Sequence, residues 1–167
     1  MNELQFIASI KKQFENYKEL GEKTFEQLSE EQLFIKINSE SNSIATIVKH
    51  ISGNMLSRWT DFLTTDGEKD WRNREEEFEL EIKDQKELME RWDKGWQCLF
   101  QAISSISKDD LATIIFIRKQ PLTVLEALHR QLTHYSYHIG QIVFIGKTIC
   151  NDNWVTLSIP KRKNSNE

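Results

Sequence analysis

The chain has 167 residues, of which 38% are hydrophobic, and this is enough for one domain with its own core. Its formal net charge of -4 gives no electrostatic reason to expect nucleic acid binding, which draws on clustered Lys and Arg. A small-molecule or protein partner is expected instead. Neither a signal peptide nor an 18-residue apolar window is present, so we expect no membrane contact and a soluble, cytoplasmic protein.

The first expected helix begins after Asn2, which forms a capping pair with Gln5, and ends at Gly21. Apolar residues recur along it every three or four positions, at Leu4, Ile7, Ile10, Phe14 and Tyr17. Residues 23–38 are expected to be irregular, with a helical turn at 29–32 and room for a short strand at 33–37.

A second long helix is expected over residues 44–64, after the polar run SESNS. His50 lies on the shoulder of its apolar stripe. Gly53 within it either allows close packing or is incidental, since glycine costs a helix about 1 kcal/mol relative to alanine. Residues 65–83 then form a charged connection with a turn at Asp66-Gly67, and a connection of this length is often functional.

The third helix is expected to start at Asp84 and to end near Ser107. Residues 111–119, LATIIFIRK, are rich in β-branched side chains. The segment is too short for another helix as long as the first three, so it indicates a strand or extended arm. The fourth helix covers residues 123–147 and has an apolar stripe with a second stripe beside it at the same spacing, which predicts neighbours on two sides. These elements indicate an all-α four-helix bundle with a short extended arm or hairpin before the last helix.

The domain is expected to cover residues 1–160. Trp154, Leu157 and Ile159 are predicted to anchor the end of the chain, and the polar tail at 161–167 to be disordered. Cys98 and Cys150 are too few for a disulfide framework and are predicted to be reduced.

His134 and His138 are the main reason to expect a metal ion. They are four residues apart, so they lie about 6 Å apart along one helix and both rings can reach one ion. With His50 they form a candidate set of three ligands, which suits Zn²⁺ or a similar ion and leaves one position open for water or substrate. Further candidates to support a ligand or contact a substrate are Gln141, Gln131, Asn54, Arg72 and Arg74.

A plainer interpretation of these residues stays open. Two histidines at this spacing are common by chance, and periodicity alone cannot assign His50 to the set. His129 points away from the other two and is expected to be a surface or packing residue. Arg72 and Arg74 are by default a solvated pair in the loop. No phosphate loop, GxSxG elbow or CxxC motif is present, so a catalytic residue is not assigned.

The combination of His50 with HYSYHIGQ at 134–141 resembles the DinB superfamily of DinB/YfiT-like metalloenzymes. The segments DGEKDWRNREEEFE, IRKQPLTVLEALHRQLTHYSYHIGQIVF and WVTLSIP resemble an uncharacterised, mostly bacillary branch of it. The resemblance covers nearly the whole chain. It implies a four-helix bundle in which His50, His134 and His138 bind zinc, nickel or another divalent ion.

The resemblance also implies a function. Similar proteins transfer low-molecular-weight thiols such as bacillithiol, and the ion would hold the co-substrate sulfur as a thiolate aimed at an electrophile. The expected activity is therefore a metal-dependent thiol S-transferase acting on a small molecule, in a homodimer. The alternatives are a non-catalytic metal-binding or stress-associated module and a metal-dependent hydrolase. Fold alone does not decide between them.

Overall fold

The computed structural model describes residues 2–79 and 82–159. The molecule is mostly helical, as predicted, with one small antiparallel sheet. The helices are α1 (Glu3–Phe25), α2 (Glu30–Leu33), α3 (Ile44–Trp59), α4 (Gln85–Ser105) and α5 (Val124–Cys150). The strands are β1 (Ile114–Ile117) and β2 (Gln120–Thr123), and three 3-10 turns are η1 (Glu76–Phe78), η2 (Lys108–Ala112) and η3 (Asn151–Asn153).

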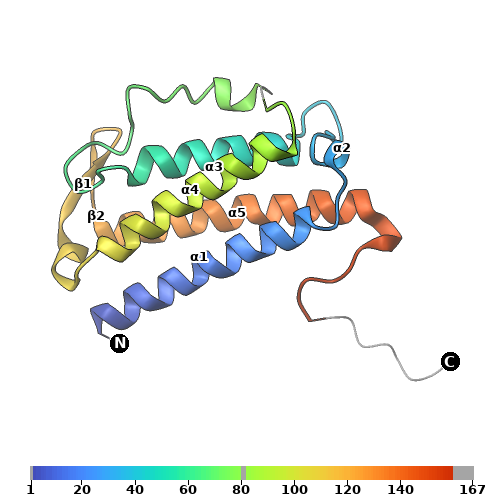
Figure 1. Cartoon of the computed structure of the whole chain (residues 1–167). Helices are drawn as coiled ribbons and strands as arrows, with labels where there is room; N and C mark the ends of the chain where they lie inside the picture. The colour runs from blue at the N-terminus through green and yellow to red at the C-terminus, as the bar shows by residue number, and fades with distance from the viewer. Residues whose placement is uncertain (1, 80–81, 160–167) are drawn as a thin grey trace.

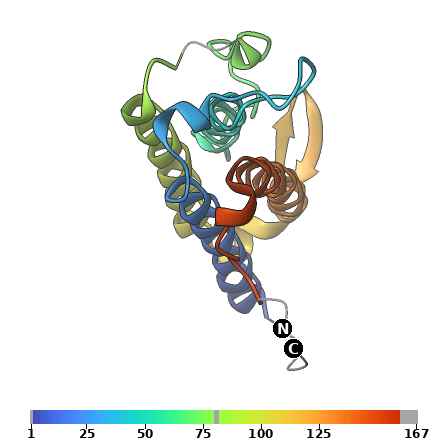
Figure 2. The same ribbon diagram turned by 90° about the vertical axis from the view of Figure 1, so that its right-hand side faces the viewer.

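The four long helices lie side by side, with α3 against α4 and α1 against α5 (Figures 1 and 2). In Figure 1, α1 and α5 run in one direction, whereas α3 and α4 both run in the other. The connection from α3 to α4 therefore returns along the length of α3 before α4 begins. This explains why the charged segment at 65–83 is so long.

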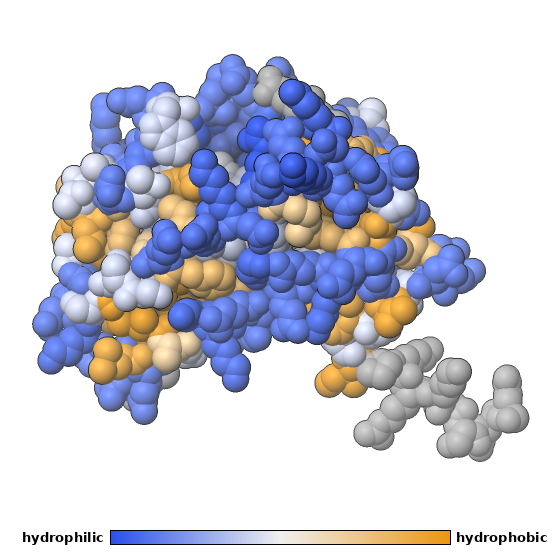
Figure 3. Space-filling model, in the orientation of Figure 1, coloured by the Kyte–Doolittle hydropathy of each residue, from blue (hydrophilic) through white to orange (hydrophobic). Residues whose placement is uncertain are grey.

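One hydrophobic cluster joins the four long helices. Its largest fully buried side chains include Phe14 of α1, Met55 of α3, Trp92 and Trp96 of α4 and Tyr135 of α5. The face in Figure 3 is mostly hydrophilic, with hydrophobic side chains in smaller patches. Within the described residues, no helix is both long and apolar enough to cross a membrane.

Three of the predicted helix ends are wrong, and the smallest difference is at α5, which continues past Lys147 to Cys150. Helix α1 continues past Gly21 to Phe25. Gly21 does not end the helix but allows close packing: it faces the ring of Trp92, which a Cβ would approach to 2.5 Å. Helix α3 ends at Trp59 rather than Thr64, since Thr60 is extended and Asp61 takes a positive φ of 48°. The apolar pattern had continued only because Phe62 remains buried after the helix has ended.

The predicted arm before α5 is a two-stranded hairpin. The register pairs Ile114 with Thr123 and Ile117 with Gln120, so Arg118 and Lys119 form a two-residue turn. Both turn residues have positive φ, 55° and 61°, although neither is glycine. The carboxylate of Asp66 accepts both of their backbone N–H groups, at 2.9 and 2.7 Å, and this fixes the turn against the loop after α3.

Other expectations have mixed outcomes. No strand forms at residues 33–37, where Ile35 and Ile37 are exposed. Cys98 and Cys150 are free thiols, as predicted. Trp154 packs against the core, whereas Ile159 is 92% exposed and anchors nothing. The predicted disordered tail at 161–167 lies outside the described residues.

Candidate metal centre

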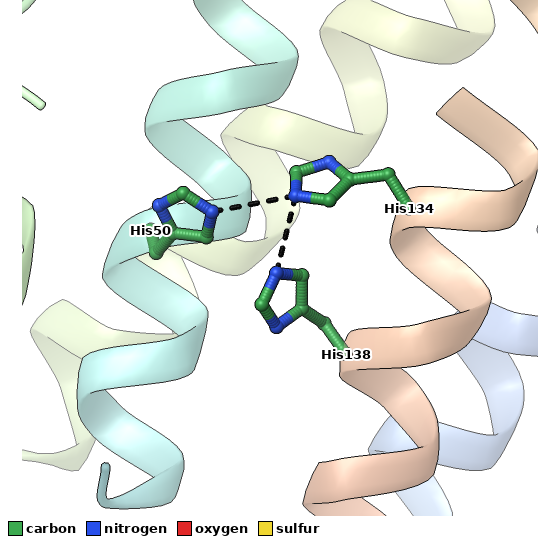
Figure 4. Close-up of side chains that lie close together, drawn as sticks. All are labelled: His50, His134 and His138. Atoms are coloured by element: carbon green, nitrogen blue, oxygen red, sulfur yellow. Dashed lines mark hydrogen bonds between the residues drawn. The ribbon is translucent and has the colours of Figure 1, made fainter. Parts of the chain in front are cut away.

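Three histidine rings meet between α3 and α5. His50 extends from α3, while His134 and His138 extend from successive turns of α5 toward it (Figure 4). The Nε2 atom of His134 lies 3.4 Å from Nε2 of His50 and 3.1 Å from Nε2 of His138. The three nitrogen atoms all lie within 4.8 Å of one another. The group is therefore close enough to hold one metal ion, as the spacing predicts.

The outer nitrogen of His50 is held by a buried carboxylate. His50 Nδ1 lies 2.8 Å from Glu77 Oε2, and both side chains are less than a tenth exposed. Arg72 donates to both oxygens of the same carboxylate, from Nε at 2.7 Å and from Nη2 at 2.9 Å. Because an ionised Glu77 acts only as an acceptor, the neutral, metal-binding form of His50 carries its proton on Nδ1 and presents the lone pair of Nε2 to the cluster.

His138 is held in the same way by a neighbour on its own helix. Its Nδ1 donates to Oε1 of Gln141 at 2.8 Å, and Gln141 Nε2 donates in turn to the hydroxyl of Tyr137 at 3.2 Å. This places the lone pair of His138 Nε2 toward the other rings. Gln141 thus has the supporting position that its spacing from His138 predicts.

The donor set fits a divalent ion. Tetrahedral nitrogen ligands at 2.0–2.1 Å from zinc stand about 3.4 Å apart, close to the two separations in the cluster. His50 and His138 both turn lone pairs toward His134, which has at most one proton on Nε2 to share between them. The cluster therefore holds more acceptors than donors at its centre, and a cation satisfies them all.

One known protein family matches nearly the whole chain. Residues 2–163 match the family described as "Protein of unknown function (DUF1572)". The chain belongs to the DUF1572 family. No curated protein and no solved structure matched it.

Burial keeps two of the three rings of this DUF1572 chain neutral. The pKa of His134 is lowered from 6.5 to about 3, first by burial and then by the neighbouring histidines. Burial likewise lowers the pKa of His138 to about 4, against the opposing effect of its bond to Gln141. Neutral imidazole is the form that binds metal, so the cluster is ready to accept an ion at neutral pH.

Glu77 reaches His50 because the loop after α3 is fastened to the helix. Burial alone would raise the pKa of Glu77, but its bonds to His50 and Arg72 hold the pKa below its usual value. Lys49 donates to the carbonyl oxygens of Glu76 and Glu79, at 2.6 and 2.8 Å. Gly53 leaves the space that the carboxylate fills, since a Cβ there would lie 2.5 Å from Glu77 Oε1. The close-packing interpretation of Gly53 is therefore correct, with a loop as its neighbour.

The remaining predicted residues of the DUF1572 chain border a cavity of about 210 Å³ beside His50 and His134. Asn54 and Gln131 are buried in its wall, with Arg72 and Arg74 from the loop. A larger cavity of about 480 Å³ lies behind Glu77 and Arg72, but it does not reach the histidines. We therefore take the smaller one as the approach to the cluster.

Several sequence interpretations change here. Arg72 is not a solvated loop residue, because its side chain is 2% exposed. Arg74 is exposed, with its guanidinium 5.4 Å from the ring centre of Phe78, which itself stacks on His50. His129 is a surface residue packed on Phe6, as expected.

Sequence reasoning missed Glu77 as well as Arg58, Arg118 and Arg130 at the cavity. Glu77 stands in a run of acidic residues at 75–79, and nothing in that run distinguishes it from its neighbours. Arg58 had a usable signal, since it faces the same way as Asn54 one turn earlier on α3.

Proposed function

We propose that this protein is a divalent-metal-dependent enzyme of the DinB superfamily that transfers a low-molecular-weight thiol to an electrophilic small molecule. The resemblance described above supports the superfamily, and the four long helices with histidines on α3 and α5 are compatible with its four-helix bundle. Zinc or nickel is the proposed ion and a bacillithiol-type thiol the proposed co-substrate.

One observation carries the proposal: three histidine nitrogen atoms converge beside a cavity. A structural zinc site usually has four protein ligands, whereas a reactive site has three and leaves a position for water or substrate. Among the described residues, the group that can hold a metal contains three histidines and no fourth side chain. His50 and His134 also border the 210 Å³ cavity, which leads a small molecule to the cluster.

The residues of the chain have separate tasks in this proposal. His50, His134 and His138 hold the ion, which when bound supplies the positive charge that lowers the pKa of a thiol. Glu77 and Gln141 fix two of the rings through their Nδ1 protons. The stacked ring of Phe78, 4.9 Å from the His50 ring, covers one side of the site from the loop. A site enclosed in this way excludes water from the sulfur.

Metal analysis tests the site first. Purified wild type is compared by elemental analysis with His134→Ala and with His129→Ala, a matched change on the same helix outside the cluster. The wild type and His129→Ala are expected to contain about one ion per chain, and His134→Ala to contain almost none. Equal metal content in all three proteins would remove the histidine cluster from consideration.

A second assay tests the reaction. Metal-loaded wild type is incubated with bacillithiol and monochlorobimane, and the rate of conjugate formation is compared with that of His134→Ala. We expect turnover only in the wild type. Metal binding without conjugation would favour the non-catalytic module, and hydrolysis of a model ester without conjugation would favour the hydrolase.

A further inference from the structure

The cavity beside the histidines has an unusual charge. Five arginines from four segments of the chain border its 210 Å³, together with His50, His134 and two side-chain amides. They are Arg58 of α3, Arg72 and Arg74 of the following loop, Arg118 of the hairpin turn and Arg130 of α5. Like charges gather this closely only where a negative charge compensates them.

The acidic residues of the chain compensate only part of this charge. Glu68 accepts hydrogen bonds from Arg58 at 3.0 Å and from Arg118 at 2.7 Å, while Glu77 is shared by Arg72 and His50. Within the described residues, Arg74 and Arg130 form no ion pair. Asp66 also lies close enough to Arg58 for their charges to interact, so three carboxylates face five guanidinium groups and about two positive charges remain at the cavity.

Two buried polar atoms in the wall also lack partners within the described residues. Arg72 Nη1 makes no hydrogen bond, and it lies 3.9 Å from the nearest oxygen of Glu68, beyond hydrogen-bonding distance. Gln131 is 2% exposed, and its Oε1 accepts no hydrogen bond. Leaving such groups unsatisfied costs about 1–3 kcal/mol each, and more for a charged group. A donor and an acceptor are thus available in one wall.

The backbone around the cavity is shaped to bring a distant arginine to it. Arg118 takes a positive φ of 55°, and Asp66 holds that turn through two backbone N–H groups. Burial would raise the pKa of Asp66. The hydrogen bonds from the backbone N–H groups of Glu68, Lys119 and Arg118 instead keep this pKa below its usual value. The turn residue Arg118 can then reach Glu68 and the cavity from the far side of the loop.

We propose that this cavity binds the oxyanion group, a carboxylate or a phosphate, of the small molecule that reacts at the histidine cluster. Guanidinium groups pair with both kinds of oxyanion through parallel N–H bonds, and several of them suit a group with two or three oxygens. The volume holds such a group and not a whole drug-sized ligand, so the rest of the molecule extends outside. Gln131 favours a ligand with an O–H or N–H group beside its oxyanion.

The reacting role of this ligand rests on the proposed function, but binding of the anion does not. Isothermal titration of metal-free protein with inorganic phosphate, succinate and uncharged succinamide therefore tests the site alone. We expect phosphate or succinate to bind and succinamide not to bind. The anion that binds more tightly shows which kind of oxyanion the cavity prefers. Equal binding of succinate and succinamide, or no heat with either anion, would overturn the proposal.

Two arginine variants test where the anion binds. Arg130→Gln removes an exposed arginine of the cavity that pairs with no carboxylate among the described residues, and should weaken binding on the order of tenfold. Arg91→Gln removes the same charge from α4, outside this cavity, and should leave the affinity within about twofold. Equal losses in both variants would mean that the anion responds only to net charge.

The histidine variant separates this proposal from the proposed function. His138 belongs to the metal group but is not among the residues that line the cavity, so His138→Ala should lose metal and keep most of its anion affinity, whereas Arg130→Gln should keep metal and lose anion affinity. Normal metal binding without anion binding would reject the cavity and leave the metal-dependent enzyme standing. Anion binding without metal binding would reject the metal-dependent enzyme and leave the anion-binding cavity standing.

Discussion

Glu77 is the residue on which the orientation of His50 depends. Glu77 is not one of the three ligands, but it fixes the tautomer of His50. Arg72 in turn holds the Glu77 carboxylate from the other side. A carboxylate in this position typically strengthens metal binding 10- to 100-fold. The site is therefore a histidine cluster with a built support, which a coincidental HxxxH spacing would lack.

Glu77→Gln is expected to weaken metal affinity by about 10- to 100-fold while the protein stays folded. The amide keeps the shape of the carboxylate but loses the charge that stabilises the His50 proton and pairs with Arg72. Competition titration against a chelator measures the change. Glu75→Gln, an exposed change in the same acidic run, serves as the control, and equal affinity in both variants would argue against the support.

The lowered pKa values of His134 and His138 predict how stability depends on pH. In the unfolded chain both rings take up protons near pH 6.5, whereas in the folded protein His138 stays neutral until about pH 4 and His134 until about pH 3. The unfolded state thus binds more protons in this window. The free energy of unfolding of the metal-free protein should fall as pH drops from about 7 to 4.

Urea denaturation of metal-free protein at several pH values measures this dependence. A variant with His134→Gln and His138→Gln should lose much of the slope between pH 6.5 and 4. Below that window, carboxylates such as Glu77 begin to protonate and stability should fall in both proteins. An unchanged slope in the variant would mean that other groups cause the dependence.

Residue-scale prediction succeeded where the residues share one helix and failed across the loop. His134, His138 and Gln141 are related by helical spacing, which the sequence displays directly. His50 was a candidate from the start, but its assignment needed a family resemblance, because its side of α3 depends on packing. Glu77 could not be found at all, since its contact with His50 depends on where a loop without regular structure returns.

At the scale of single elements, helix α3 shows how a glycine serves the site. Alanine is favoured over glycine within a helix by about 1 kcal/mol, so Gly53 weakens α3 locally. The space it leaves is occupied by Glu77, whose carboxylate is fixed by Arg72 and cannot move aside freely. The helix gives up some local stability to admit the residue that orients His50.

Gly53→Ala is therefore expected to lower metal affinity by displacing Glu77, even though the helix itself becomes more favourable. Gly140→Ala is the matched control, because a Cβ at that position of α5 meets nothing within 4 Å. The control should raise the free energy of unfolding by up to about 1 kcal/mol and leave metal binding intact. Unchanged metal affinity in Gly53→Ala would show that Glu77 does not need its present position.

Helix positions were predictable from apolar spacing and capping residues, but helix ends were less so. The capping boxes at Asn2 and Thr123 mark the starts of α1 and α5 as expected. Gly21 was taken as a helix end, although tertiary contact with Trp92 explains it. Asp61 ends α3 through its own backbone conformation, which the pattern of buried residues around it conceals.

At the scale of the whole molecule, an ion bound by the three histidines would link folding to the site. His50 of α3 and His134 of α5 are 84 residues apart in the sequence, so the unfolded chain does not preserve the cluster. An ion that binds only the folded state at 100 times its Kd adds about 2.7 kcal/mol to the free energy of unfolding. For a chain of this size that corresponds to a rise in Tm of roughly 5 to 10 °C.

Thermal unfolding with and without added zinc or nickel measures this rise. The wild type and His129→Ala should both shift, whereas His134→Ala should not. The ion that gives the larger shift at equal concentration is the tighter ligand. A shift of equal size in His134→Ala would mean that the ion stabilises the protein from another site.

The homodimer remains a prediction at this scale. Ile114 and Phe116 alternate on the hairpin and are about half exposed, and Phe144 on α5 is 67% exposed. Sedimentation analysis of wild type and of Phe116→Ser compares their masses in solution. A dimer that persists in Phe116→Ser but separates in Phe144→Ser would place the contact on α5, and a monomeric wild type would reject it.

The order and direction of the helices were the least predictable part of the fold. Apolar spacing identified four long helices, but it contains no information on which of them run in parallel. The length of the connection at 65–83 was interpreted as a sign of function. In the structure, α3 and α4 run in the same direction (Figure 1). The connection between them therefore runs back along the length of α3 to the point where α4 begins.

That returning connection contains none of the three histidines, yet it supplies Glu77, Arg72 and Arg74 to their surroundings. The parts that hold the molecule together and the parts that adjust its chemistry are thus carried by different stretches of chain. Exchanging this stretch among relatives should alter which ion or reactant is preferred without refolding the scaffold. Divergence of activity within such a lineage would then be concentrated in a segment that an inspection of the histidines alone would overlook.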